Sequence, residues 1–510
     1  MPNDEPPVED DGIDFEKQQS AQPATVSEAP TDASGSMSPP ETPPAPSDDE
    51  VRSQWAAHAE QQLVSERSRD AKSNIDTRPP EGEVVSFRSV LIAEIYVGQA
   101  ADSLTTALGA IEWINSDKPI SVRIVEARRG SGYSQVVFEL VSDMTQRVPS
   151  SYGLTSLPSG IDHIWARYRV IGPAIVAVVF TFVLADDEAK RIDVALREDA
   201  ESRLRTGSLP GVETVRDIKR KRVRGAQHEV IRRCLAWLKK RMPGTLSTAQ
   251  EGFYLPTCVV VSVAVGKPFD TQAEYMVLLN LTEPSSAEKF LRPSAEKFVR
   301  LPFLFLIDRS AVRAGGWMVA AFNEAEARGG FTGLPEFIEF IDFLVSDLMI
   351  VDGSDAVLRS FEPQLRDVRA DLNRLDIDKP ATIRVIGLRT RLLGLSREIS
   401  TIGGDVAVLL DDAVGIWLAF WELTLVEPTE GTSATAQTTP DTERRRLRRA
   451  LETLQGQEVG LRELILITSS AMTETRTLKL SHTLNRLTWV LVVLTVVLVA
   501  LTVVQLVHTP

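Results

Sequence analysis

The sequence LTWVLVVLTVVLVALTVVQLV, residues 487–507, decides the architecture of this 510-residue chain. Fifteen of its 21 residues are Leu or Val, and none is Asp, Glu, Lys or Arg. At a rise of about 1.5 Å per residue, a helix of this length crosses the roughly 30 Å hydrocarbon core of a bilayer. We therefore predict one transmembrane helix that anchors the chain at its C-terminus, in preference to a helix buried in a soluble core.

Basic residues before this segment predict its orientation. Arg476, Lys479 and Arg486 precede it, whereas no Lys or Arg follows it in residues 508–510. Lys and Arg accumulate on the cytoplasmic side of membrane helices. We therefore expect a single-pass membrane protein with its N-terminal bulk in the cytoplasm and its C-terminus on the far side. Its two cysteines are too few for a disulfide framework, which is compatible with a reducing cytosol.

The leucines of the apolar segment follow a heptad pattern that begins before it. Alternating steps of four and three residues join Leu480, Leu484, Leu487, Leu491, Leu494, Leu498, Leu501 and then Gln505. Such a seam predicts self-association, with a hydrogen bond across helices at the Gln position. Lipid exposure of the same leucines is the alternative. The candidate residues for transmembrane self-association in a homo-oligomer are Leu487, Leu491, Leu494, Leu498, Leu501 and Gln505.

Charge is distributed unevenly along the chain. The net charge is −14, but residues 1–50 carry 13 acidic residues against one lysine, or −12, so the other 460 residues carry only −2. The N-terminal region is also rich in Pro, Ser and Ala and poor in large apolar residues. It cannot bury enough surface to offset the entropy of ordering. We therefore predict a disordered acidic tail over residues 1–82.

Residues 85–350 alternate between strand and helix patterns, which predicts an α/β (or α+β) cytosolic domain. The apolar run 174–184 is too short to cross a bilayer, so we interpret it as a buried central strand, with a second membrane segment as the alternative. A Gly-Ser-Gly hairpin turn is expected at 129–132. The other strands are expected at 89–97, 120–127, 133–141, 163–170, 257–265, 275–281, 299–307 and 316–322, with helices at 100–115, 186–197 and 334–349.

From residue 354 the pattern becomes helical. Apolar residues at steps of three and four predict coiled-coil helices over 354–426, a loop at 427–440 and a stalk helix over 441–486 that enters the membrane. This arrangement is a long helical hairpin. Five glycines interrupt its first arm and either allow a second helix to approach closely or mark a bend: Gly387, Gly394, Gly403, Gly404 and Gly415.

No catalytic, cofactor or metal signature stands out, and the cofactor is left open. The clearest charged feature is a basic stretch that can contact anionic lipid headgroups or the phosphates of a nucleotide. A solvated helix face balanced by neighbouring acids is the alternative, and no specific nucleic acid is predicted. Its residues are Arg216, Lys219, Arg220, Lys221, Arg222, Arg224, Arg232 and Arg233. A second cluster, Arg444–Arg446 with Arg448 and Arg449, opposes the dipole of the helix it begins, which predicts a compensating partner or lipid.

The order of a cytosolic α/β domain, long stalk helices and a C-terminal membrane segment, over residues 85–510, is similar in layout to the CorA family of magnesium channels. That family has two membrane helices and a Gly-Met-Asn signature, whereas this chain has one apolar segment and no Gly-Met-Asn, so no residue role is transferred. We predict a C-terminally membrane-anchored sensor, scaffold or recruitment protein that oligomerises through its stalk. The alternatives are a divergent CorA-like ion transport protein and an unrecognised enzyme in the α/β domain.

Overall fold

The computed structural model divides the chain into two units, residues 1–54 and 55–510, and the following concerns the second. The residues that the structure describes are 48–114, 119–129, 134–142, 152–205, 211–249, 255–266, 273–279, 281, 290–293, 303–306, 317–328, 334–374, 382–410, 423–426 and 439–508.

A mixed β-sheet of 11 strands forms the centre of the described part. Its strand order is β13-β10-β11-β12-β9-β1-β6-β5-β3-β4-β2, with neighbours antiparallel except for the parallel pairs β9–β12 and β3–β4. The bounds are β1 Val85–Val97, β2 Glu112–Ile114, β3 Ser134–Val141, β4 Tyr152–Leu154, β5 Ile161–Val170, β6 Ile175–Leu184, β9 Thr257–Val263, β10 Phe290–Pro293, β11 Phe303–Leu306, β12 Met318–Asn323 and β13 Leu423–Val426. A separate pair joins β7 (Arg203–Leu204) to β8 (Val212–Glu213).

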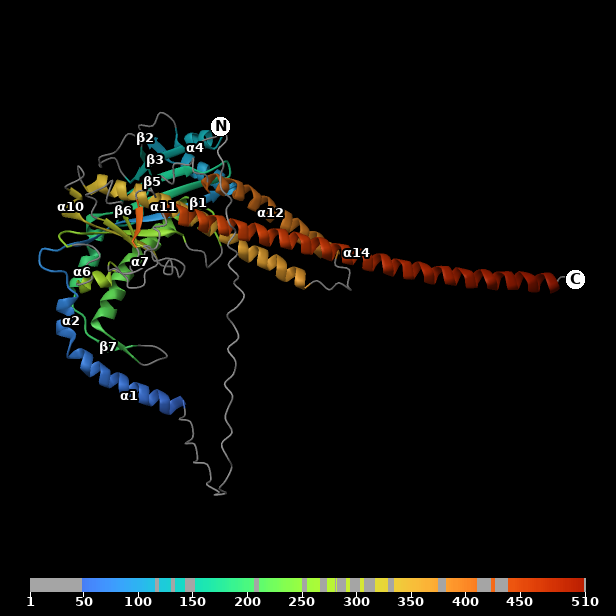
Figure 1. Cartoon of the computed structure of the whole chain (residues 1–510), viewed down its shortest axis with the longest axis horizontal. Helices are drawn as coiled ribbons and strands as arrows, with labels where there is room; N and C mark the ends of the chain where they lie inside the picture. The colour runs from blue at the N-terminus through green and yellow to red at the C-terminus, as the bar shows by residue number, and fades with distance from the viewer. Residues whose placement is uncertain are drawn as a thin grey trace, which may run out of the picture. The chain divides into compact units, whose positions relative to one another are not determined.

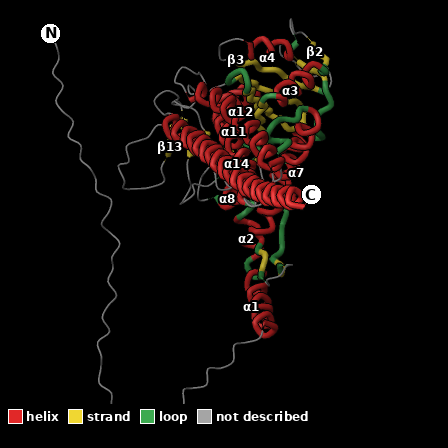
Figure 2. The backbone as a smooth tube through the Cα atoms, turned by 90° about the vertical axis from the view of Figure 1, so that its right-hand side faces the viewer, coloured by secondary structure: helices red, strands yellow, loops and turns green. Residues whose placement is uncertain are grey.

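Helices cover both faces of the sheet (Figures 1 and 2). One face packs against α3 (Gln99–Gly109), α4 (Ile120–Arg129), α6 (Arg191–Arg197), α7 (Val215–Arg241) and α8 (Glu274–Leu278). The other packs against α11 (Leu334–Asn373), α12 (Thr382–Leu410) and α14 (Thr439–His508). The other described helices are α1 (Asp48–Arg67), of 20 residues, and the short helices α2 (Asp70–Asp76), α5 (Asp186–Ala189) and α10 (Glu324–Arg328). The chain is therefore an α/β sheet domain followed by long helices.

Strand β6 explains the apolar run at 174–184. It lies between β1 and β5, so its backbone groups are paired on both sides. Ala177 and Val179 pack into the core beneath α11, whereas Val178 and Phe180 pack into the core on the opposite face. A strand buried on both faces must be apolar at every position. The prediction of a buried central strand is confirmed, and the alternative of a second membrane segment is wrong.

Two segments expected as strands are helices. Residues 120–127 belong to α4, in which Ile120 and Ile124, one helical turn apart, are buried. Residues 275–281 begin in the short helix α8, which buries Tyr275 and Met276. Both segments are too short for period two and period 3.6 to be told apart by apolar spacing. The hairpin turn expected at 129–132 and part of the strand expected at 299–307 lie outside the described residues.

Helical structure begins at Asp48, inside the range 1–82 that the composition predicts to be disordered. Polar contacts fix α2 to the body: the Asn74 amide donates to the Ala200 carbonyl at 2.8 Å, and an Asp70 carboxylate oxygen accepts from the Ser202 N–H at 2.8 Å. Apolar burial contributes nothing to α2, which has no buried residue, so a composition argument misses it.

Helix α11 runs without a break through 350–354, where the sequence predicts the change from the α/β domain to the coiled-coil helices. The sequence Asp352-Gly-Ser-Asp355 resembles that of a turn, yet the side chains of Ser354 and Asp355 both make hydrogen bonds within the helix. Ser354 donates to the Ile350 carbonyl at 2.9 Å, and Asp355 accepts from Arg359 at 3.0 Å. Gly353 is required because a Cβ atom there would lie 2.9 Å from the Ile95 side chain of β1. The same helix therefore packs on the sheet and on α12 and α14.

The long helices differ from expectation at two further points. Helix α12 ends at Leu410 in the described residues, and Leu423–Val426, expected to be helical, form β13 on the edge of the sheet beside β10. Helix α14 is one helix of 70 residues from Thr439 to the C-terminal apolar segment (Figure 1). Among the described residues, α14 is the helix that is long and apolar enough to cross a membrane.

Candidate functional site

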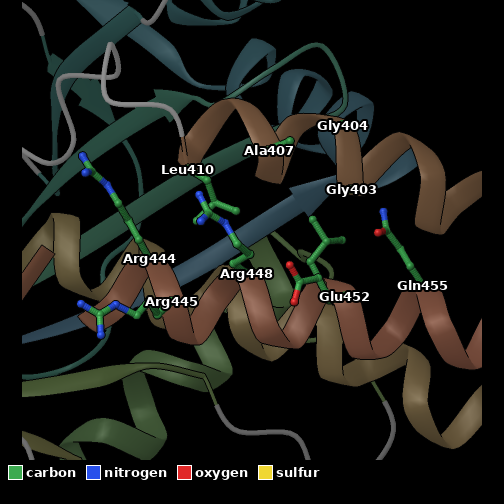
Figure 3. Close-up of a pocket in the computed structure, with 10 residues that line it drawn as sticks. Gly403, Gly404, Ala407, Leu410, Arg444, Arg445, Arg448, Glu452 and Gln455 are labelled. Carbon is green, nitrogen blue, oxygen red and sulfur yellow. The ribbon is translucent and has the colours of Figure 1, made fainter. Parts of the chain in front are cut away.

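A groove of about 900 Å³ opens between α12 and α14 (Figure 3). Four of its lining residues come from α12 and six from α14. They are Gly403, Gly404, Ala407 and Leu410, and Arg444, Arg445, Arg448, Leu451, Glu452 and Gln455.

Two adjacent glycines on α12 shape this groove in different ways. A Cβ atom on Gly403 would lie 3.2 Å from Leu451 and from Gln455, so Gly403 lets the two helices approach closely. A Cβ atom on Gly404 would meet nothing within 4 Å among the described residues, so Gly404 leaves space. The expectation of close approach is thus met at Gly403, whereas Gly387 and Gly394 face open space and Gly415 lies outside the described residues.

Arginines give the groove its charge. Arg444, Arg445 and Arg448 lie in the second and third turns of α14, so three guanidinium groups start within about 6 Å along the helix axis. Figure 3 shows Arg448 and Gln455 reaching from α14 toward α12. The groove is therefore strongly electropositive at the end nearest the start of α14.

Arg446, from the same cluster, has a structural role. Its guanidinium is part-buried, contacts Asp352 of α11 and lies 3.1 Å from the Glu443 carboxylate. Burial alone would lower its pKa, but Asp352, Glu443 and Asp355 outweigh that effect and raise the pKa of Arg446 above its usual range. The partner expected to compensate this helix start is therefore, for Arg446, a set of carboxylates within the chain.

The polar side chains that line the groove are arginines, one glutamate and one glutamine. A guanidinium presents forked N–H donors that match phosphate and carboxylate oxygens. Glu452 and Gln455 lie farther along α14 and offer acceptors and one amide donor. Among its described lining residues there is no Ser, Thr, Cys, His or Lys to act as a nucleophile. The groove thus presents guanidinium donors at one end and a carboxylate and an amide at the other.

Most of the basic stretch on α7 is already paired. At least five of its eight residues contact acidic side chains or a carbonyl in the described part of the chain, which favours the interpretation of a balanced helix face. The contacts are Arg216–Glu274, Lys221–Glu213, Arg222–Glu198, Arg233–Glu188 and the Lys219 Nζ to the Leu196 carbonyl. Burial lowers the pKa of Lys219 to about 8. The other three, Arg220, Arg224 and Arg232, lie on the same helix.

A second group of charges is buried between the sheet and α11. Arg167 and Arg169, two residues apart on β5, contact Asp342 and Asp347 of α11; the Arg167–Asp342 distance is 3.0 Å. These side chains are nearly inaccessible, so they hold α11 on the sheet rather than bind a ligand. The sequence analysis assigns 163–170 only as a strand, because the partners Asp342 and Asp347 lie more than 170 residues away in the chain. The spacing of two, which puts both arginines on one face, was the available signal.

Metal and thiol chemistry find no support in the described residues. No group of three or more His, Cys, Asp or Glu is placed there to hold a metal ion. Cys234 and Cys258 are both buried, and burial raises the pKa of each thiol far above the physiological range. Neither thiol is therefore an activated nucleophile.

The residues predicted for transmembrane self-association lie on the apolar end of α14. Leu487, Leu491, Leu494, Leu498 and Leu501 are exposed in the single chain, and the side chain of Gln505 lies outside the described residues. No protein-family model matches the sequence, and no curated protein or solved structure matches it. Function is therefore inferred from the residues and their geometry.

Proposed function

We propose that this chain is a membrane-anchored sensor or recruitment protein that self-associates along α14. The observation that carries the proposal is the continuity of α14, which lines the groove at one end and is long and apolar enough to cross a membrane at the other. A single helix joins the groove to the apolar segment. A ligand that shifts α14 in the groove therefore also shifts the anchored end of the same helix.

One face of α14 is used within the chain. Leu447, Leu451, Leu454, Leu461 and Ile465 are buried against α11 and α12. A second series of apolar residues lies at multiples of seven residues, interrupted at position 473 by Thr, and its members are between 48% and 64% exposed. At 3.6 residues per turn its first members lie about 110° around the helix from the buried face. We call this series the outer stripe: Val459, Leu466, Leu480, Leu487, Leu494 and Leu501.

Lipid cannot cover the whole outer stripe. Leu466 precedes the apolar segment by 21 residues and Val459 by 28, or roughly 30 Å and 40 Å of helix. Both side chains therefore face water in a single chain. A heptad series that starts in water and continues into the membrane segment favours the same helix of a second copy as its partner. Copies anchored in one bilayer present their stripes in parallel and at the same height.

The basic residues beside the anchor support a cytosolic location of the sheet domain. Arg476, Lys479 and Arg486 all precede the apolar segment. Basic residues flank membrane helices on the cytoplasmic side. We place the α/β body and the groove there, so that the groove samples soluble molecules of the cytosol.

Oxidative crosslinking in membranes tests the self-association. Val459→Cys and Leu466→Cys should each give a disulfide-linked dimer, because in-register copies bring identical stripe positions together. Leu464→Cys is the matched control: Leu464 is 42% exposed but lies about 160° around α14 from Leu466. The two native thiols are buried and should contribute little background. Equal crosslinking at all three positions, or monomers throughout, would contradict the proposal.

A further inference from the structure

We propose that the groove between α12 and α14 binds a soluble organic phosphate of nucleotide size. This inference deepens the proposed sensing function by naming the ligand class, although binding itself does not require α14 to pair with a second copy. Arg445 and Arg448 carry it: neither makes an ion pair with any residue in the part of the chain that the structure describes.

Arg446 differs from Arg445 and Arg448 because carboxylates of the chain pair with it. Arg446 is held by Asp352 and Glu443 in the interior, whereas its neighbour Arg445 lines the groove and is exposed. Arg445 lies three residues before Arg448 on one face of α14, and like charges at this spacing destabilise a helix, an effect that a bound anion relieves. Because Asp352 and Glu443 pair with Arg446, we assign the counter-anion of Arg445 and Arg448 to a ligand.

The size and polarity of the groove define the ligand further. From Arg444 to Gln455 the lining spans 11 residues of α14, or about 16 Å. A volume of about 900 Å³ is in the range of sites for drug-sized ligands. Because Glu452 repels a second anionic group, the phosphates belong at the arginine end. A hydroxyl- or amine-bearing part then lies beside Glu452 and Gln455, with Ala407 and Leu410 available for apolar contact.

The distance from the membrane segment decides between a free phosphate and a lipid headgroup. Arg448 precedes Leu487 by 39 residues, or about 58 Å of continuous helix. A headgroup of the bilayer that holds α14 lies too far away to enter the groove when the helix stands along the membrane normal. The ligand is therefore a soluble molecule.

Equilibrium binding to the full chain in detergent micelles tests this inference. The probes are ATP, inorganic pyrophosphate, adenosine and vesicles that contain phosphatidylserine. ATP and pyrophosphate should bind saturably, with ATP the tighter because the groove also contacts its nucleoside. Adenosine alone should not bind, and the vesicles should not compete. Arg448→Glu should weaken ATP binding at least about tenfold, since it removes a charge-assisted contact and adds repulsion.

Arg449→Glu is the matched control, because Arg449 is exposed on the same turn but does not line the groove. It should bind ATP as the unaltered chain does, and thermal unfolding should show that both variants fold. The inference is overturned if no phosphate probe binds saturably, if only the lipid vesicles bind, or if both variants lose affinity equally. Crosslinking through Val459→Cys separates the two proposals, since it should persist in the Arg448→Glu background.

Discussion

The carboxylate of Asp405, on α12, occupies the place that a Cβ atom on Gly172 would take. Asp405 Oδ2 accepts hydrogen bonds from the backbone N–H groups of Ala174 and Ile175, each at 2.8 Å. Burial raises the pKa of Asp405, although these two hydrogen bonds act in the opposite direction. The turn between β5 and β6 therefore fixes the position of α12, and with it one wall of the groove.

Gly172→Ala should destabilise the protein by about 2 kcal/mol or more. The new Cβ atom must displace a buried carboxylate and leave backbone N–H groups without an acceptor, at roughly 1–3 kcal/mol for such a group. Thermal unfolding of the full chain in detergent measures the effect. Gly211→Ala is the control, because a Cβ atom there meets nothing within 4 Å among the described residues. Equal stability of the two variants would contradict this account of the turn.

The two groove glycines should respond differently to alanine. Gly404→Ala should stabilise the protein by up to about 1 kcal/mol, since it lowers the entropy cost of the helix and places its methyl group in open space. Gly403→Ala should lose that gain, because its methyl group meets Leu451 and Gln455 at 3.2 Å. Unfolding midpoints of the two variants give the comparison. A larger gain for Gly403→Ala would show that the helices are not closely packed there.

Arg446→Ala should cost about 3–5 kcal/mol of unfolding free energy, because it leaves the buried carboxylates of Asp352 and Glu443 without their cation. Arg445→Ala, at the adjacent exposed position, should change stability by less than about 0.5 kcal/mol. Chemical unfolding measures both. In a double-mutant cycle, Asp352→Ala should cost less in the Arg446→Ala background than alone. If the free-energy costs of the two single substitutions simply add in the double variant, Asp352 and Arg446 do not interact.

Glu94, buried on β1, should make stability depend on pH. Burial raises its pKa from 4.5 to about 7, even though the N–H groups of Ile95, Leu246 and Ser247 donate to it. The folded chain then binds a proton that the unfolded chain has lost. The contribution of the Glu94 carboxyl to the free energy of unfolding is complete below about pH 4.5 and is lost as the pH rises to about 7.

Glu94→Gln removes that titration. Relative to the unaltered chain, the variant should therefore gain about 3 kcal/mol of stability between pH 4.5 and pH 7.5. Unfolding curves of both proteins across this range measure the difference. A difference that does not change with pH would show that Glu94 titrates normally.

The sequence predicts those elements whose burial is uniform. The run at 174–184 is recognisable because a strand buried on both faces must be apolar at every position, and the strand at 163–170 is recognisable from its alternating pattern. Helix α4 was assigned wrongly because its few apolar residues fit both periods. The turn-like residues around Gly353 lie inside a helix whose neighbours there, Ile95 and Arg446, are far away in the sequence.

The candidate site was visible in part. The arginine cluster at 444–449 stands out in the sequence, and so do Gly403 and Gly404. That these arginines and glycines face each other across two helices cannot be recognised in the sequence. It depends on the rotation of α14 about its axis, which directs Arg446 inward to Asp352 and leaves Arg445 and Arg448 at the groove. Partners on separate helices leave no local signal of their pairing.

Alkaline carbonate extraction of membranes is the most direct test of the central claim that α14 joins the groove to a bilayer. The full chain should stay with the membrane pellet, whereas a variant that stops after Arg486 should be released while keeping its unfolding midpoint. Release of the full chain, or retention of the shortened one, would contradict the account.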